Sequence, residues 1–422
     1  MRLAAALALP ALALLSGCAW SLVDDGHIRE APFADVVTRT AAARGDPRPE
    51  HVDARVVSQD EVPALLRASI EQEWPAAELA RYQARLVAVG LWPPERDLLE
   101  ETLLVARDEV AGFYLPESRV LYVVEGFHVP FSVRFFSALL RRDVMREVVL
   151  SHELVHLLQH LDAPRLFDAS SWMEQDDAGE AVQAALEGDA THYGFRALMQ
   201  GGSGALPDPA EMEAGLESEV SSSDGALAEA PGLLRLTLAF PYARGYPLSL
   251  AEGRMLLENP PASTEQVLHE ERRFADFEVA DLAGLEPALP AGCESLGQNT
   301  LGELGIWVLL HDLGAAEAAA ASDGWDGDRY LAARCGGQLA FLWWTAWDSE
   351  AEAQEFERVY AGIAAAVAAR AGLAAPPRSQ RAGRAVVVWS DPLEGLAGLP
   401  DTAARRARIS SLDELRAHFQ LD

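Results

Sequence analysis

The sequence predicts an α+β fold in which helices predominate. Apolar residues recur at helical spacing over 61–73, 76–90 and 148–160, and the period changes to that of strands between 109 and 124. Half of the 422 residues are hydrophobic, so the chain can bury a large core. We therefore expect a compact, mainly helical unit over 61–375 with a small β-sheet near residues 109–124.

The N-terminus has the pattern of an export signal. An apolar run over residues 3–15 follows Arg2 and ends at Leu-Ser-Gly-Cys18. The run is too short to span a bilayer but has the length of a signal-peptide apolar region. Its end resembles a bacterial lipobox, which implies a signal peptide over 1–17, a lipidated Cys18 and a lipid anchor in the cell envelope. Ala19, rather than an aspartate, follows this cysteine, which resembles the outer-membrane sorting signal of enterobacterial lipoproteins. An ordinary secretory signal is the alternative.

Residues 18–60 are polar, contain scattered Pro and Arg, and show no clear period. We expect a tether followed by irregular structure. Helices are predicted next over 61–73 and 76–90, and the second ends at a glycine with two prolines close behind it.

Two short apolar runs then predict a pair of strands. They cover 110–115 and 120–124 and flank a turn of Pro, Glu and Ser. A strand beside a metal-binding helix can pair with an extended substrate through main-chain hydrogen bonds. An ordinary hairpin of a small mixed sheet fits the pattern equally well.

The apolar helix over 148–160 contains the motif His152-Glu153-x-x-His156. Residues four apart lie on one face of a helix, so the two histidines can bind one Zn²⁺. Glu153 can then reach a water on that ion, as in zinc metallopeptidases. The alternative is a buried helix with two histidines that only pack in the core.

A catalytic zinc site needs a third protein ligand and an open position for water. The third histidine of a metzincin is absent, because Gln159 and Asp162 occupy the positions that such a site requires for Gly and His. The next helical stretch offers Glu180 and Glu187, which are seven residues apart and nearly on one face. Chemistry alone leaves both open.

Several later side chains suit supporting roles. A carboxylate can orient a ligand histidine through its outer nitrogen, and the candidates are Asp189, or Asp176 and Asp177. A donor must also stabilise the tetrahedral oxyanion, and spacing does not rank the candidates His192, Tyr193 and His269.

The rest of the chain is less specific. Residues 201–231 are rich in Gly, Ser and acids and predict a flexible acidic insertion. Glu303 begins an apolar helix and can pair with Arg329 or neighbour the metal. Within the C-terminal extension over 376–422, a strand and a short helix are predicted. The large aromatics are expected in the core: Trp325, Trp343, Trp344 and Trp347.

Charge and cysteine usage bound the partners. A net charge of -31 argues against nucleic acid and against a bare anionic membrane surface. Apart from Cys18, the chain has Cys293 and Cys335, which can form a disulfide outside the cytoplasm. Two separate buried thiols are the alternative.

Short motifs follow one another in a fixed order over roughly residues 105–360. They are Gly112-Phe113-Tyr114, His152-Glu153-Leu-Val-His156-x-Leu-Gln159, Ala185-Leu186-Glu187-Gly188-Asp189-Ala190-Thr191, Phe240-Pro241-Tyr242-x-x-Gly245, Ser263-Thr264-Glu265-Gln266-Val267-Leu268-His269, Leu301-Gly302-Glu303, Gly324-Trp325-x-Gly327-Asp328-Arg329-Tyr330 and Trp344-Thr345-x-Trp347-Asp348. This series resembles an uncharacterised bacterial and archaeal family of HExxH proteins, many of them lipoproteins, with a zincin-like, gluzincin-type metallopeptidase core. The chain departs from the family at Glu270 and Glu271, where Pro-Glu is common.

The resemblance implies a zincin-like core with Glu187 as the third zinc ligand. It further implies hydrolysis of a peptide or protein substrate, with Glu153 as the general base and Zn²⁺ as the cofactor. The competing interpretation is a catalytically inactive zincin-fold lipoprotein that acts as a binding or structural protein of the envelope. Within enzymes, hydrolysis of non-peptide amides is the other option.

Overall fold

The structure is a computed structural model that describes residues 21–126, 142–168, 172, 174–200, 205–222, 225–398 and 405–421. Cys18 and the expected signal peptide lie outside these residues. The described part is an α+β fold in which helices predominate, as the sequence predicts. Among the described helices, none is both long and apolar enough to span a membrane.

The chain forms two compact units. Unit 1 comprises the described residues of 1–59, 110–158 and 193–204. Unit 2 comprises those of 60–109, 159–192 and 205–422. Two long helices, α6 (Val144–Asp162) and α7 (Asp176–Met199), contribute residues to both.

Unit 1 contains a three-stranded sheet in the order β3-β5-β4. Strand β4 (Gly112–Leu115) pairs antiparallel with β5 (Val120–Glu125), which confirms the predicted strand pair. Strand β3 (Asp53–Ser58) lies parallel to β5 on its other side. Strand β4 is therefore an edge strand of this sheet as described.

The expectation of irregular structure over 18–60 is wrong for much of that range. It contains β1 (Val23–Asp24), β2 (His27–Ile28), α1 (Glu30–Arg44) and β3. Helix α1 buries Val36, Val37 and Ala41. Strand β3 forms because it pairs with β5, which lies far along the chain. Such long-range pairing leaves little trace in the local period.

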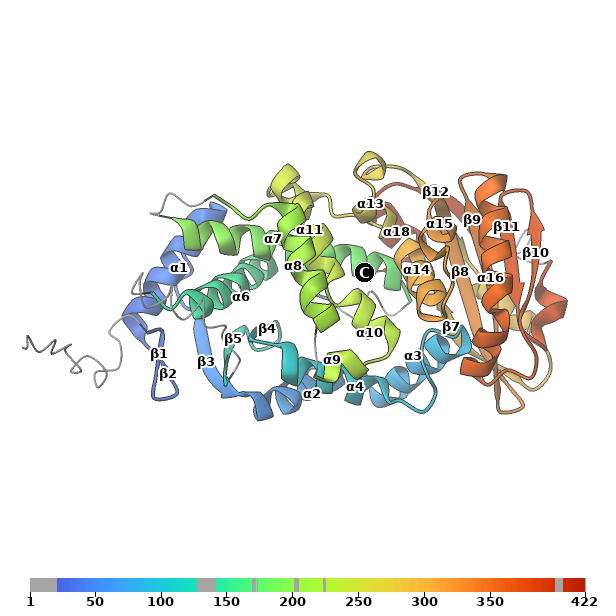
Figure 1. Ribbon diagram of the computed structural model, residues 1–422, viewed down its shortest axis with the longest axis horizontal. Coiled ribbons are helices and arrows are strands. Elements are labelled where there is room, and N and C mark those ends of the chain that lie inside the picture. Colours follow the sequence, from blue (N-terminus) through green and yellow to red (C-terminus); the bar gives the residue numbers. More distant parts are fainter. Residues whose placement is uncertain are drawn as a thin grey trace, which may run out of the picture. The chain divides into compact units, whose positions relative to one another are not determined.

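Unit 2 combines many helices with a five-stranded antiparallel sheet in the order β10-β11-β9-β8-β7 (Figure 1). The strands are β7 (Cys293–Asn299), β8 (Trp325–Cys335), β9 (Gln338–Trp347), β10 (Arg378–Ala382) and β11 (Ala385–Trp389), and a separate pair joins β6 (Phe277–Asp281) to β12 (Arg405–Ile409). The remaining helices are α2 (Val62–Glu73), α3 (Ala76–Ala88), α4 (Leu98–Glu109), α8 (Pro209–Ser222), α9 (Ala226–Glu229), α10 (Gly232–Thr237), α11 (Phe240–Glu252), α12 (Met255–Glu258), α13 (Glu265–Leu268), α14 (Gly302–Asp312), α15 (Ala318–Ser322), α16 (Glu350–Ala371) and α18 (Leu412–Phe419).

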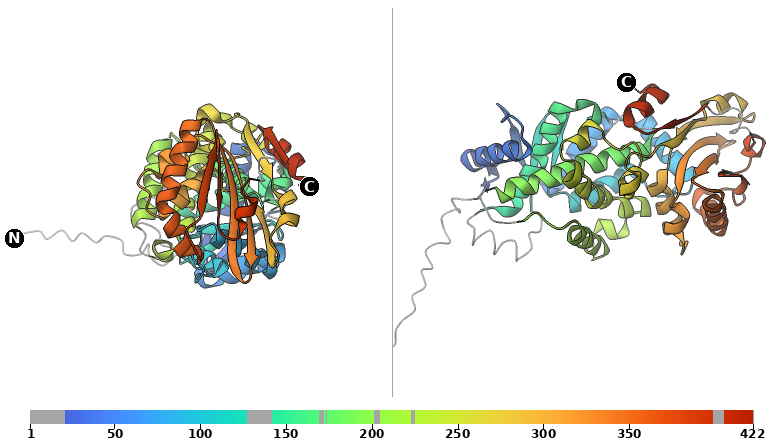
Figure 2. Two further views of the ribbon diagram at one scale, coloured as in Figure 1. Left: turned by 90° about the vertical axis from the view of Figure 1, so that its right-hand side faces the viewer. Right: turned by 90° about the horizontal axis from the view of Figure 1, so that it is seen from above.

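Alternation along these strands gives the large sheet two apolar faces. One face presents Phe341 and Trp343 to the main core, where Trp343 meets Phe356 of α16 edge to face. The other face presents Leu342 and Trp344 to a smaller core beneath a short 3₁₀ helix, Leu393–Leu396. The left view of Figure 2 shows α16 on one side of the strands. The four predicted core tryptophans are all buried.

Two regions, the C-terminal extension and the acidic stretch, have more regular structure than the sequence predicts. Strands β10 and β11 lie in the expected extension over 376–422 but complete the five-stranded sheet. The stretch 201–231, expected to be flexible, contains α8 and α9. Leu227 of α9 is buried against Val105, so a few apolar residues suffice to order this part of the acidic stretch.

Cys293 and Cys335 form a disulfide, the first of the two alternatives that the sequence leaves open. They face each other across β7 and β8, so strand register brings the two thiols together.

Candidate metal centre

Helix α6 positions the two histidines of the HExxH motif. Its sequence is apolar nearly all round, and Leu150, Leu154 and Val155 are fully buried. One turn of helix separates His152 from His156, and their Nε2 atoms face each other 3.1 Å apart. Two nitrogens bound at about 2.0–2.1 Å to one tetrahedral ion would be roughly 3.3 Å apart, so the pair fits zinc.

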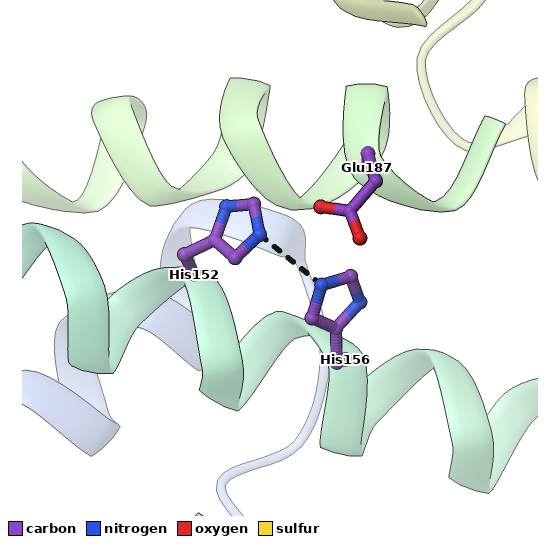
Figure 3. Close-up of side chains that lie close together, drawn as sticks. All are labelled: His152, His156 and Glu187. Atoms are coloured by element: carbon purple, nitrogen blue, oxygen red, sulfur yellow. Dashed lines mark hydrogen bonds between the residues drawn. The ribbon is translucent and has the colours of Figure 1, made fainter. Parts of the chain in front are cut away.

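Helix α7 supplies a carboxylate to the same point. Ligand atoms of His152, His156 and Glu187 all lie within 4.8 Å of one another. Figure 3 shows the Glu187 carboxylate directed toward the two imidazole rings. Gln183, one turn earlier on α7, donates a hydrogen bond from Nε2 to Glu187 Oε1 at 2.7 Å, which fixes the carboxylate's orientation. Of the two glutamates that the sequence offers, the structure places Glu187 beside the histidines.

Gln159 and Asp189 tie the two helices together next to this point. Gln159 of α6 donates from Nε2 to Leu186 O and to Asp189 Oδ2, each at 2.9 Å. Both side chains are fully buried. Farther along α7, a Cβ at Gly194 would lie 3.5 Å from His152 N. The helices therefore touch both near Glu187 and near His152.

Two glycines let α7 and α11 cross at backbone distance beside Glu187. A Cβ at Gly188 would lie 2.1 Å from Gly245 O, and a Cβ at Gly245 would lie 1.8 Å from Ala184 O. Neither position can therefore hold a larger residue without a backbone shift. The same crossing brings His192 Nδ1 within 3.0 Å of Ser249 Oγ.

Strand β4 approaches α6 at the candidate base, Glu153, which is buried. A Cβ at Gly112 would lie 2.3 Å from Val149 Cγ1 and 3.6 Å from Glu153 Cγ. Glycine at this position thus allows the edge strand to lie directly against the motif helix.

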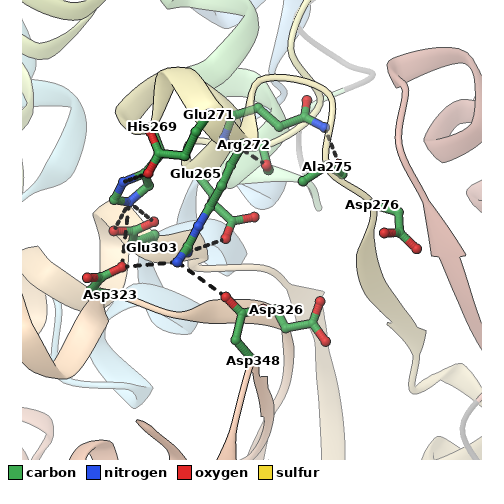
Figure 4. A network of polar contacts seen from close by, with 12 residues as sticks. Glu265, His269, Glu271, Arg272, Ala275, Asp276, Glu303, Asp323, Asp326 and Asp348 are labelled. Carbon is green, nitrogen blue, oxygen red and sulfur yellow. Dashed lines mark hydrogen bonds and ion pairs between the residues drawn. The ribbon is translucent and has the colours of Figure 1, made fainter.

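A second group in unit 2 also gathers metal-ligand side chains. Ligand atoms of His269, Glu303 and Asp323 lie within 4.8 Å of one another. His269 Nε2 lies 2.8 Å from Glu303 Oε1, and this hydrogen bond raises the pKa of the imidazole. Arg272 lies beside this group and forms ion pairs with Asp323 at 3.6 Å and with Asp348, outside the group, at 3.3 Å. Figure 4 shows both pairs. Ion pairs with His269 and Arg272 therefore offset much of the negative charge of the acids in this group.

The other predicted site residues have partners of their own. Tyr82 donates to Asp176 at 3.1 Å, and Thr264 donates to Asp177 through both N and Oγ1. Tyr193 is buried under the guanidinium of Arg196. The proposed pairing of Glu303 with Arg329 is wrong: Glu303 pairs with His269, while Arg329 binds Gln298, Thr300 and the Glu174 carbonyl.

Sequence reasoning missed two supporting residues, Gln183 and Gln159. Gln183 lies four residues before Glu187, a spacing that places the two side chains together on a helix. That spacing was a usable signal. The role of Gln159 depends on a partner 30 residues later, and local spacing does not reveal it.

The chain matches the model of a domain of unknown function (DUF8575) over residues 290–396. This span contains β7 to β11 of the large sheet and Glu303 and Asp323, whereas the HExxH histidines and Glu187 precede it. No curated protein and no solved structure matches the chain. The comparisons thus leave the function to be argued from the site.

Proposed function

We propose that this protein is a zinc-dependent metallopeptidase. The observation that carries the proposal is the meeting of His152, His156 and Glu187 around one point. Two imidazoles and one carboxylate are the ligand set of gluzincin-type catalytic zinc, and three protein ligands leave a position for water. A purely structural zinc site is normally closed by four protein ligands.

Each residue then has a distinct task. His152, His156 and Glu187 would hold the ion, and Gln183 keeps the carboxylate in place through its hydrogen bond. Zinc held there would lower the pKa of a water molecule and polarise the scissile carbonyl. Glu153, about 100° round the helix from His152, accepts the proton of the attacking water and delivers it to the leaving amine.

The edge strand supports a peptide as substrate. Strand β4 presents a backbone edge in the described sheet, and Gly112 brings that strand against Glu153. An extended peptide can add to such an edge through main-chain hydrogen bonds, which place its amides with little demand on sequence. The lipobox further suggests that the enzyme works in the cell envelope, anchored through Cys18.

The decisive experiment combines metal content with hydrolysis. We expect the purified protein to bind one zinc at this centre and to cleave an unstructured protein such as casein. Glu153→Gln should keep the zinc and lose at least about 100-fold in rate, because the water loses its base. Glu258→Gln, a change of the same kind at an exposed position, should leave both unchanged.

Two outcomes would contradict the proposal. Cleavage that survives Glu153→Gln would remove the base from the mechanism. Protein that binds zinc yet cleaves no peptide or casein under any condition would favour the inactive envelope lipoprotein.

A further inference from the structure

Unit 2 contains a cavity of about 890 Å³ that the proposed peptidase chemistry does not use. Its lining comes from helices α2, α3 and α4 and from residues of α7, α10 and α14. Most of the wall is apolar, with Leu79, Leu86, Val87 and Leu304 among the residues that line it. A cavity of this size accommodates a small molecule.

Glu180 of α7 lines this cavity. Among the described residues, its carboxylate has no hydrogen-bond or ion-pair partner. Burial, together with repulsion from Asp176, raises the pKa of Glu180 to about 7. Glu180 is half-buried, and a partly buried carboxylate without a partner is costly. A cation supplied from outside would reduce that cost.

The neighbouring groups suit the same kind of guest. Trp74 and Tyr82 both line the cavity and meet edge to face with ring centroids 5.4 Å apart. Aromatic rings beside a carboxylate favour an ammonium group through cation–π attraction. Arg85 covers one face of Tyr82, and Trp74 is half-buried.

The rim adds to this preference. Acidic side chains outnumber basic ones along the cavity: Glu71, Glu73, Asp97, Glu100, Asp176 and Glu180 against Arg67 and Arg334. Arg67 is moreover bound to Glu100 by two hydrogen bonds of 2.8 and 2.7 Å. A cation entering the cavity would therefore meet an attractive field.

We propose that this cavity is a binding site for an apolar small molecule that bears one amine. The ammonium group pairs with the Glu180 carboxylate, and the apolar body packs on the leucines of the wall. A carboxylate guest would be repelled by Glu180 and Asp176. A neutral alcohol would leave Glu180 without a counter-charge. This site stands whether or not the HExxH centre is a peptidase.

The test uses three probes of one shape: 4-phenylbutylamine, 4-phenylbutanol and 4-phenylbutyrate. Isothermal titration calorimetry at pH 7.5 on the purified protein measures each. We expect the amine to bind at least about ten-fold more tightly than the alcohol, and the carboxylate to bind least. Glu180→Gln should weaken the amine at least about ten-fold and leave the alcohol unchanged.

Two further variants keep the result interpretable. Glu258→Gln removes the same charge at an exposed position that does not line the cavity, and should change amine affinity by no more than about two-fold. Ala84→Phe adds bulk to a residue that lines the cavity and should weaken all three probes together. A cooperative melting transition shows that each variant is folded, and for Glu180→Gln its midpoint should be no lower than that of the wild type. Equal binding of amine and alcohol, a Glu180→Gln variant with wild-type amine affinity, or absence of binding at millimolar probe would each overturn the proposal.

Discussion

Glu180 and Glu187 lie two turns apart on α7 but differ in their surroundings. Glu187 accepts a hydrogen bond from Gln183 and faces the two histidines. Glu180 faces a cavity instead. We expect Glu187→Ala to reduce zinc below about one tenth per chain, and Glu180→Ala to retain full zinc, as measured by elemental analysis after dialysis. Retention of zinc by Glu187→Ala together with its loss from Glu180→Ala would move the third ligand to Glu180.

The raised pKa of Glu180 gives a second prediction at the residue scale. The unfolded chain has a glutamate pKa near about 4.3, whereas the folded chain holds this proton up to about pH 7. The folded state therefore binds more protons between these values, and the free energy of unfolding falls as pH rises through that window. Asp176 on the same helix strengthens the effect, because its carboxylate repels that of Glu180.

Glu180→Gln keeps the shape and removes the charge. We expect it to stabilise the protein by up to about 3 kcal/mol at pH 8, and by less as the pH is lowered to 5. Urea denaturation at the two pH values measures the difference. Glu71→Gln, at an exposed site, serves as the control and should show no such dependence. A gain of equal size at pH 5 and pH 8 would show that Glu180 is not a buried titrating group.

At the scale of elements, the crossing of α7 and α11 holds Glu187 in place. Gly245 packs on the Ala184 carbonyl so closely that a Cβ would lie 1.8 Å from it. Gly245→Ala must push the helices apart, so we expect a loss of at least about 2 kcal/mol in stability and weaker zinc binding. A chelator competition assay measures the zinc affinity.

Gly362→Ala provides the matched control. Gly362 lies on the exposed face of α16, and nothing lies within 4 Å of a Cβ placed there. Alanine is a better helix former than glycine, so this variant should gain about 0.5–1 kcal/mol. If both variants were equally stable and bound zinc equally, the close crossing would have no influence on the metal centre.

At the scale of the whole molecule, the sequence predicts what local spacing encodes. The HExxH helix, the β4–β5 pair and the capped helix after Ser411 all follow from periods of a few residues. The sheet order β10-β11-β9-β8-β7 does not, because strand pairing is chosen by side-chain packing among distant segments.

The hydrogen bonds of a buried polar side chain, like the strand order, depend on segments that are distant in sequence. Asp328 accepts hydrogen bonds from Leu301 N and Gly302 N and from the indoles of Trp325 and Trp343. These donors lie on three segments, so Asp328 fixes the start of α14 and with it the position of Glu303. Its motif was visible in the sequence, but its role was not, because the role exists only once those segments are packed together.

The disulfide offers a test at this largest scale. Cys293 and Cys335 are 42 residues apart in sequence, and the closed loop contains α14 and α15. In the chain-entropy model, closing such a loop lowers the entropy of the unfolded chain and so raises its free energy by about 4 kcal/mol. We expect the double variant Cys293→Ser/Cys335→Ser to lose up to about this much stability, measured by urea denaturation through the fluorescence of the buried tryptophans of the large sheet.

Wild-type protein treated with dithiothreitol is the control for the side-chain change. It should unfold at the same urea concentration as the double serine variant, because both lack the cross-link and retain the β7–β8 register. If oxidised and reduced wild-type protein unfolded at the same urea concentration, the bond would not restrict the unfolded chain further. The pairing of β7 with β8 would then already do so. In that case the bond would contribute little beyond the strands that it joins.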